Sequence, residues 1–248
     1  MQKQLFLNTK EADIRHDGSS DVTFNFNQQI AVRDEEVLSV AVASAVIPSS
    51  FYVIHELNNT LVYTENTGSN TQSTITLDSG NPSVSHLVAE LATKLGMSFA
   101  VTYNSVTNRM VITNSLHDFA LLPSSTCLKL LGFNPSAQHP STHNGLLNTL
   151  TSDNCVDLAG PRCLYLETSS FSTDSLDSRG DSNILAAVPN IEPAGHVISY
   201  APNMPHTSTT NTRVVTSMRI MLRDHENEKV NLNGLDYSLV LLLRAVPR

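Results

Sequence analysis

The chain has 248 residues, which is enough to bury a sizeable core as one large β domain or as one domain that carries an insertion. It contains 15 Lys and Arg against 23 Asp and Glu, a formal net charge of -8, which disfavours a surface built to neutralise phosphates. Only 15% of the residues are charged, and Ser, Thr and Asn take many of the polar positions. We therefore expect a neutral, hydrogen-bonding surface and no direct nucleic-acid partner.

The amino-terminal residues contain no apolar run long enough for a signal peptide, and no later stretch is as long as a membrane span. We expect a protein that is made and kept in the cytosol until it assembles. Its three cysteines, Cys127, Cys155 and Cys163, are odd in number and lack the spacing of metal ligands. They are interpreted as buried thiols, with neither a disulfide framework nor a zinc site.

Three strands are predicted before residue 55. Residues 5–14 and 21–32 are the first two, with a turn at 16–20, and Val22, Phe24 and Phe26 alternate with polar residues as in a half-buried strand. Residues 37–47 form a long Val/Ala run that Pro48 ends. These strands predict the beginning of a β-sandwich.

From residue 56 the pattern changes to that of a small α+β module. Short strands are predicted at 59–65 and 73–77, followed by a helix that Ser83 or Ser85 caps and Gly96 ends, with an apolar stripe of Leu87, Leu91 and Leu95. A hairpin over 99–113 completes a β-β-α-β-β order, and residues 119–122 and a short closing helix at 125–133 follow it. The module has about 80 residues, within the size range of an independent domain.

Residues 134–154 are rich in Pro, Ser, His and Asn and are interpreted as a connector. Strands then resume at 162–167, 184–188 and 196–200, separated by a polar loop at 169–183. About eight strands therefore lie outside the module, three before it and roughly five after, which is the strand count of a jelly roll.

The terminal stretch, 213–248, predicts the final pair of strands. Val214, Thr216, Met218, Ile220 and Leu222 alternate with more polar residues, and a charged break at 224–228 and the Asn233-Gly234 turn signal follow. The apolar run at 237–246 suits a strand buried on both faces better than a helix, because it has no helical stripe and a proline follows it. A strand so apolar at the end of a chain must be inserted between strands already present.

Five short stretches in this order resemble the minor capsid (penton) proteins of polinton-like viruses, virophages and adintoviruses. They are SAVIPSSFY at 44–52, NNTLVY at 58–63, TITL at 74–77 with Gly80, LLGF at 130–133 and VNLNGLDYSLV at 230–240. The resemblance implies a mainly β chain, a single jelly-roll β-sandwich formed by residues 1–55 and 135–248, with the α+β domain inserted at 56–134. It also implies a pentamer at the vertices of an icosahedral capsid that contacts the major capsid protein, and a location in the virion after assembly in the host cytoplasm or nucleus.

Two alternatives stay open beside the penton interpretation. One is a receptor- or carbohydrate-binding spike or fibre head, which would more often be a trimer, and the other is a minor capsid subunit that links capsomers. The tripeptide Arg179-Gly180-Asp181 lies in the polar loop and is the sequence that integrins bind, so it is a candidate receptor site; a solvated turn is the plainer interpretation.

Catalytic, metal and cofactor sites are not expected. His139 and His143 lie four residues apart, but Pro140 stands between them in a loop-like stretch. His55-Glu56 and His225-Glu226 lack the second histidine of a zinc-protease helix, and no nucleophile elbow or phosphate-binding glycine loop is present. We therefore expect a structural protein and not an enzyme.

Overall fold

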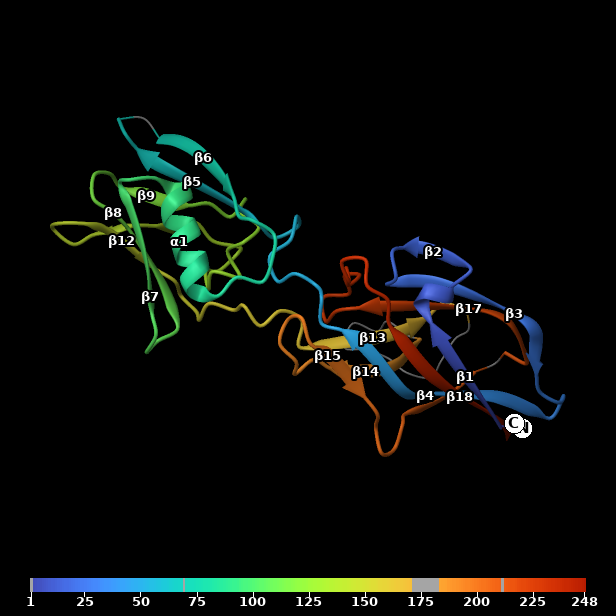
Figure 1. The fold of residues 1–248 in the computed structure, drawn as a ribbon. Coiled ribbons are helices and arrows are strands. Elements are labelled where there is room, and N and C mark those ends of the chain that lie inside the picture. Colours follow the sequence, from blue (N-terminus) through green and yellow to red (C-terminus); the bar gives the residue numbers. More distant parts are fainter. Residues whose placement is uncertain (1, 69, 171–182, 211) are drawn as a thin grey trace. The chain divides into compact units, whose positions relative to one another are not determined.

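The computed structural model describes residues 2–68, 70–170, 183–210 and 212–248. The chain forms two compact units (Figure 1). The jelly-roll unit is made of Met1–Phe51 and Pro161–Arg248, and the inserted unit is Tyr52–Gly160. Each is described below by itself.

The jelly-roll unit is a sandwich of two five-stranded antiparallel sheets. The first has the order β1-β18-β4-β15, and β16 also pairs with β4. Its strands are β1 (Gln2–Asn8), β4 (Glu36–Pro48), β15 (Val197–Tyr200), β16 (Thr207–Thr209) and β18 (Ser238–Pro247). The second has the order β14-β13-β17-β3-β2, with β2 (Ile14–Asp17), β3 (Asp21–Ala31), β13 (Cys163–Thr168), β14 (Ile184–Pro189) and β17 (Val214–Arg223). The mainly β class and the sandwich predicted from the sequence are confirmed.

The last strand, β18, lies between β1 and β4, as its apolar sequence predicts. It pairs with β4 along its whole length and with β1 over seven residues. Leu239, Leu241 and Leu243 are buried in the core between the sheets. Val240 and Leu242 point to the other side and are only partly buried, so the strand is not buried on both faces within this chain.

The buried face of β17 differs from the predicted one. The pairing of β17 with β3 shifts register at a bulge between Val215 and Ser217, and Val215 shares the core face with Met218, Ile220 and Leu222. Val214 and Thr216, which strict alternation assigned to that face, are exposed. The prediction was wrong for these residues because a bulge moves every side chain before it to the opposite face.

The single opening strand predicted for residues 5–14 is also wrong. A short 3-10 turn at Thr9–Glu11 divides it into β1 in the first sheet and β2 in the second. Thr9 is buried at this corner, where its hydroxyl donates to Asp236 and accepts from the backbone N–H of Tyr237. The corner is thus fixed by residues more than 220 positions away, which no local pattern reveals.

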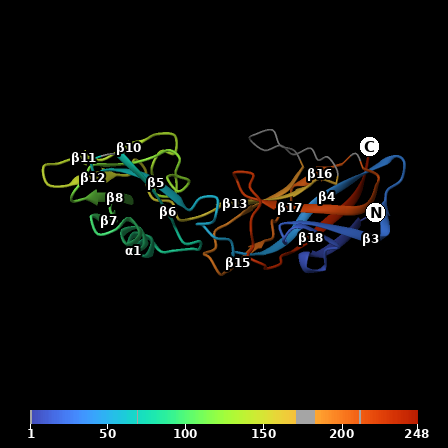
Figure 2. The same cartoon turned by 90° about the horizontal axis from the view of Figure 1, so that it is seen from above.

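The inserted unit contains two four-stranded sheets and one helix, α1 (Val84–Leu95). One sheet has the order β10-β9-β5-β6, with β5 (Thr60–Asn66), β6 (Asn70–Thr76), β9 (Phe119–Leu121) and β10 (His139–Pro140). The other has the order β11-β12-β8-β7, with β7 (Phe99–Asn104), β8 (Arg109–Asn114), β11 (Thr142–His143) and β12 (Asn148–Thr151). Figure 1 shows α1 running beside β7, and the two lie side by side in Figure 2 as well.

Helix α1 begins and ends where the sequence predicts. The Ser83 hydroxyl accepts a hydrogen bond from the backbone N–H of His86, and Gly96 ends the helix with a φ of 99°. Leu87, Leu91 and Leu95 are buried in the core of the unit. The predicted apolar stripe is therefore the face that packs on the sheet.

The predicted connector at 134–154 belongs to the inserted unit. It contributes three short strands, of which β12 pairs with β8 and β10 pairs with β9, and it buries Leu150 in the core of that unit. The structure accordingly divides the chain at Phe51 and Gly160 instead of after residues 55 and 134. Strands of two to four residues carry too little alternation to be distinguished from a polar loop.

Turns replace the short closing helix predicted at 125–133. The backbone N–H of Phe133 donates to the carbonyl of Leu128, and Gly132 has a φ of 84°. A Cβ atom on Gly132 would lie 2.4 Å from the backbone oxygen of Asn154. This contact brings the 128–133 turn against the last segment of the inserted unit and requires glycine.

We expect Gly132→Ala to destabilise the inserted unit by about 2 kcal/mol or more, because it adds a backbone clash to the strain of a positive φ. Gly145→Ala is the matched control, since Gly145 has a φ of 88° and nothing within 4 Å of its Cβ position. The control should cost about 1 kcal/mol. Differential scanning calorimetry of both variants measures the losses, and equal losses would contradict the close packing of Gly132 on Asn154.

Candidate functional site

The outer side of the first jelly-roll sheet carries exposed apolar side chains. Phe6 of β1 is directly opposite Val240 of β18, and both alternate with leucines of the core. Val46 of β4 and Val197 of β15 lie on the same side, since their neighbours Ile47 and Ile198 point into the core. We call this surface the apolar sheet face and define it as Phe6, Val46, Val197, Val240 and Leu242.

The apolar sheet face is largely open to solvent in this chain. The exposed fraction is 74% for Phe6, 45% for Val46 and 54% for Val197. Isolated exposed apolar residues are common, but this set spans four adjacent strands of one sheet. A surface of this kind is typical of a contact with another protein subunit.

The outer side of the second sheet is charged, and its charges are paired. Arg219 donates two hydrogen bonds of 2.6 Å to Asp21, and the Lys229 ammonium lies 3.0 Å from the same carboxylate. Arg223 lies 3.1 Å from Glu167. With Asp17, which lies 3.5 Å from Lys229, three carboxylates face three cations in this ion-pair network.

Asp21 is the buried centre of the ion-pair network. Burial alone would raise its pKa, but the hydrogen bonds and charges of Arg219 and Lys229 outweigh it and lower the pKa from 3.8 to about 2. The pKa values of Arg219 and Lys229 are raised in turn by their bonds to Asp21. Asp21, Arg219 and Lys229 are therefore ionised at neutral pH, and the pairing of their charges leaves little net charge on this face.

Beneath the network, the loop before β18 is held to the strands by hydroxyl groups. Ser20 donates to the carbonyl of Val230, and Ser19 donates to the carbonyl of Leu235. Tyr237 is buried, and its hydroxyl has no hydrogen-bond partner among the described residues. Burial raises the pKa of Tyr237, and the nearby charge of Asp21 raises it further, so this phenol stays protonated.

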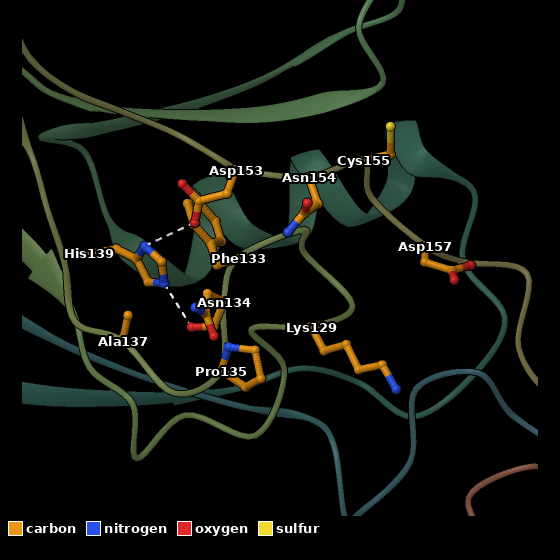
Figure 3. Close-up of a pocket in the computed structure, with 10 residues that line it drawn as sticks. All are labelled: Lys129, Phe133, Asn134, Pro135, Ala137, His139, Asp153, Asn154, Cys155 and Asp157. Carbon is orange, nitrogen blue, oxygen red and sulfur yellow. Dashed lines mark hydrogen bonds and ion pairs between the residues drawn. The ribbon is translucent and has the colours of Figure 1, made fainter. Parts of the chain in front are cut away.

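The inserted unit has a pocket of about 680 Å³ between the 129–139 turns and the 153–157 segment (Figure 3). His139 forms its inner wall. Its Nε2 lies 2.8 Å from the carbonyl oxygen of Asn134, its Nδ1 lies 3.4 Å from the Asp153 carboxylate, and its ring packs on Phe133 at 5.1 Å. Because a carbonyl only accepts, the hydrogen bond to Asn134 requires the hydrogen on Nε2, and the ring lies between the two segments.

The pocket does not bring a nucleophile and a base together. Cys155 is exposed, and Figure 3 shows it at the end of the pocket opposite His139. Nucleophilic catalysis requires the two groups within hydrogen-bond reach. The pocket residues therefore do not form a catalytic pair, and the pocket is a space between folded loop segments.

The candidate receptor tripeptide, Arg179-Gly180-Asp181, lies outside the described residues. His139 and His143 have different partners. His139 bonds to the carbonyl oxygen of Asn134, whereas His143 Nδ1 lies 2.9 Å from the side-chain oxygen of Asn148. In the described ranges, no group of three His, Cys, Asp or Glu side chains is placed to hold a metal. The helices found there also fall short, in length or in apolar character, of what a membrane span requires.

The three cysteines are free, and only Cys127 is fully buried. Burial raises its pKa to about 12, so the thiol is not a nucleophile at neutral pH. Cys163 is half-buried and Cys155 is exposed, which the sequence interpretation as buried thiols did not anticipate.

No local sequence pattern indicates the ion-pair network, because its partners are far apart in the chain. The sequence did contain a signal for the apolar sheet face. The second set of apolar residues in β18, at Val240 and Leu242, was interpreted as buried within the chain, and it is instead the outward face.

No protein-family model and no curated protein sequence matches the chain. Among solved structures, the mavirus penton protein matches with a TM-score of 0.50 and 11% identity, over 99% of this chain and 100% of that chain. A chain of the Sputnik virophage structure matches with a TM-score of 0.46 and 10% identity, over 98% and 97% of the two chains. The predicted resemblance to virophage penton proteins is thus confirmed for the fold.

We expect Asp21→Asn to lower the free energy of unfolding by about 2–3 kcal/mol at pH 7, because it leaves Arg219 and Lys229 without their carboxylate. Asp34→Asn is the control. It removes an exposed partner of Arg213 and should cost about 0.5 kcal/mol or less. Urea unfolding followed by circular dichroism measures both.

The pH dependence of this loss has a definite sign. A carboxylate whose pKa is lowered by folding stabilises the fold above its unfolded pKa, and this contribution is lost as the pH falls through the folded pKa. The difference between wild type and Asp21→Asn should therefore shrink between about pH 4 and pH 2. A difference that stayed constant over this range would contradict the ionic role of Asp21.

Proposed function

We propose that the chain is a virion structural protein, a penton whose five copies form the vertices of an icosahedral capsid and contact the major capsid protein. The observation that carries the proposal is the order of the two units. A jelly roll interrupted after its fourth strand by an α+β unit is matched to the mavirus penton protein over essentially the full length of both chains.

The two outer faces of the jelly-roll unit support this role. Subunits in a ring meet through two different surfaces, each of which must give up water. The apolar sheet face loses water at little cost, because Phe6, Val46 and Val197 are apolar and Arg244 of β18 lies beyond them at the end of the strand. The opposite face has its charges already paired within the chain, so a neighbour need not desolvate free ions there.

The function is therefore geometric and not catalytic. The jelly-roll unit supplies the ring and its contacts with the surrounding shell, and the inserted unit is joined to it by two chain crossings, near Phe51 and Pro161. Neither a cofactor nor a metal is needed for this role. The protein would act in the capsid of the virion after assembly in the cytoplasm or nucleus of the host.

Native mass spectrometry of the full-length protein tests the oligomer directly. We expect five copies of the 27.0 kDa chain. A trimer that is retained on glycan arrays would instead support a spike or fibre head and contradict the penton proposal.

The contact surface is tested by replacing two residues of the apolar sheet face, Phe6→Ser with Val46→Ser. Both side chains point away from the core, so the monomer should fold while the subunit affinity falls by about 100-fold or more. Mass photometry over a concentration series measures that affinity.

Val214→Ser is the matched control. The exposed fraction of Val214 is 46%, close to the 45% of Val46, but Val214 lies on the second sheet. We expect it to leave the oligomer intact. If Val214→Ser dissociated the oligomer as strongly as the Phe6/Val46 variant, the apolar sheet face would not be the specific contact.

A further inference from the structure

Three loops of the inserted unit meet at one end of the sheet β11-β12-β8-β7. The loop 96–98 precedes β7, the loop 115–118 follows β8, and the loop 144–147 joins β11 to β12. Phe99 is opposite Asn114, and Asn114 is opposite Asn148, so the loops are neighbours. We call them together the loop end.

The loop end lies opposite the segment through which the chain leaves the unit. After β12 the chain runs back past the start of β8, where the backbone N–H of Val156 donates to the carbonyl of Asn108. Figure 1 shows the β11–β12 hairpin, in yellow-green, reaching away from that segment. The loop end is thus the distal end of the inserted unit.

Every one of these loops exposes an aliphatic side chain. The exposed fraction is 105% for Met97, 69% for Leu116 and 86% for Leu146, and Leu147 is also exposed. Leucine and methionine side chains of this exposure contribute nothing to the core of the unit. Their gathering on adjacent loops indicates a contact with an apolar phase or partner.

The loops 115–118 and 144–147 are each held by the side chain of an asparagine that precedes the leucine. The side-chain oxygen of Asn114 accepts hydrogen bonds from the backbone N–H groups of Leu116 and His117, at 2.8 and 2.9 Å. The side-chain oxygen of Asn144 accepts from those of Leu146 and Leu147, at 3.4 and 3.0 Å. Such turns fix the loop before it binds, which lowers the entropy lost on binding.

The loop end has no cation to attract an anionic ligand. Loops 96–98, 115–118 and 144–147 contain no Lys or Arg, and their ionisable residues are His117 and Asp118. Nucleic acid, sulfated glycans and anionic lipid surfaces are bound chiefly through Lys and Arg. The surface that complements the loop end therefore carries no net charge.

We propose that the loop end inserts its Leu and Met side chains into the surface of a zwitterionic phospholipid bilayer. A fluid apolar phase accepts side chains from separate loops without a matching pocket. A protein partner fits less well, because protein contact hot spots are rich in Trp, Tyr and Arg and poor in Leu. The proposal concerns the inserted unit alone and does not depend on ring formation, although several copies on one particle would strengthen binding.

Flotation of the full-length protein with phosphatidylcholine vesicles tests the proposal. We expect wild type to float with the vesicles and Leu116→Ser with Leu146→Ser to lower the partition coefficient by about ten-fold or more, since each leucine contributes its buried area. All variants should keep the wild-type unfolding temperature, because the replaced side chains are exposed.

Val106→Ser is the matched control. Val106 is 91% exposed in the β7–β8 turn, where the side-chain oxygen of Asn104 accepts from the N–H groups of Val106 and Thr107 as in the two leucine loops. This turn lies at the opposite end of the sheet, so its replacement should change partitioning by less than about two-fold.

Three results would overturn the proposal. They are no flotation of the wild type, flotation only when the vesicles contain phosphatidylserine, and an equal loss with Val106→Ser. A wild type that does not float while the leucine variant loses attachment of particles to host cells would assign the loop end to a protein receptor. The oligomer is measured in the same samples, so a failed penton proposal is distinguished from a failed lipid contact.

Discussion

The fold depends on the pairing of β18 with β1 on one side and β4 on the other. These ladders join residues near 240 to residues 2–8 and 36–46, so the sheet is completed by the last part of the chain. Leu239, Leu241 and Leu243 fill the space between the two sheets, and the loop before β18 bonds to the Thr9 corner. The inserted unit begins after β4 of the first sheet and ends before β13 of the second sheet. Its two connections to the jelly-roll unit are therefore held by these two strands.

The outer faces of the two sheets differ in the chemistry that they expose to water. On the second sheet, Asp21 and Glu167 neutralise Arg219 and Arg223 within the chain, and the lowered pKa of Asp21 keeps its carboxylate ionised. On the first sheet, Phe6 is exposed and Val240 is only partly buried. This difference between the two sheet faces is suited to a protein that contacts other subunits through both faces of its sandwich. At the loop end, too, aliphatic side chains are exposed, on turns that asparagine side chains hold by hydrogen bonds.

Features set by local chemistry could be predicted from the sequence, and features set by distant partners could not. The caps of α1 at Ser83 and Gly96, and the Asn233-Gly234 turn with positive φ at both residues, follow from local rules. The break at Thr9 needs Asp236, and the pairing of Asp21 needs Arg219, 198 residues away. The bulge at Val215 and the short strands at 139–151 left no periodic pattern, so the buried face of β17 and the true extent of the inserted unit were missed.

We propose that β18 completes a sheet whose outward face closes a five-membered ring. A cryo-EM reconstruction of the purified full-length protein, at a resolution that separates strands, tests it most directly. We expect five-fold symmetry, with Phe6 and Val240 covered by the neighbouring copy. A particle of another symmetry, or a five-fold ring in which these two side chains face solvent, would rule out this ring contact.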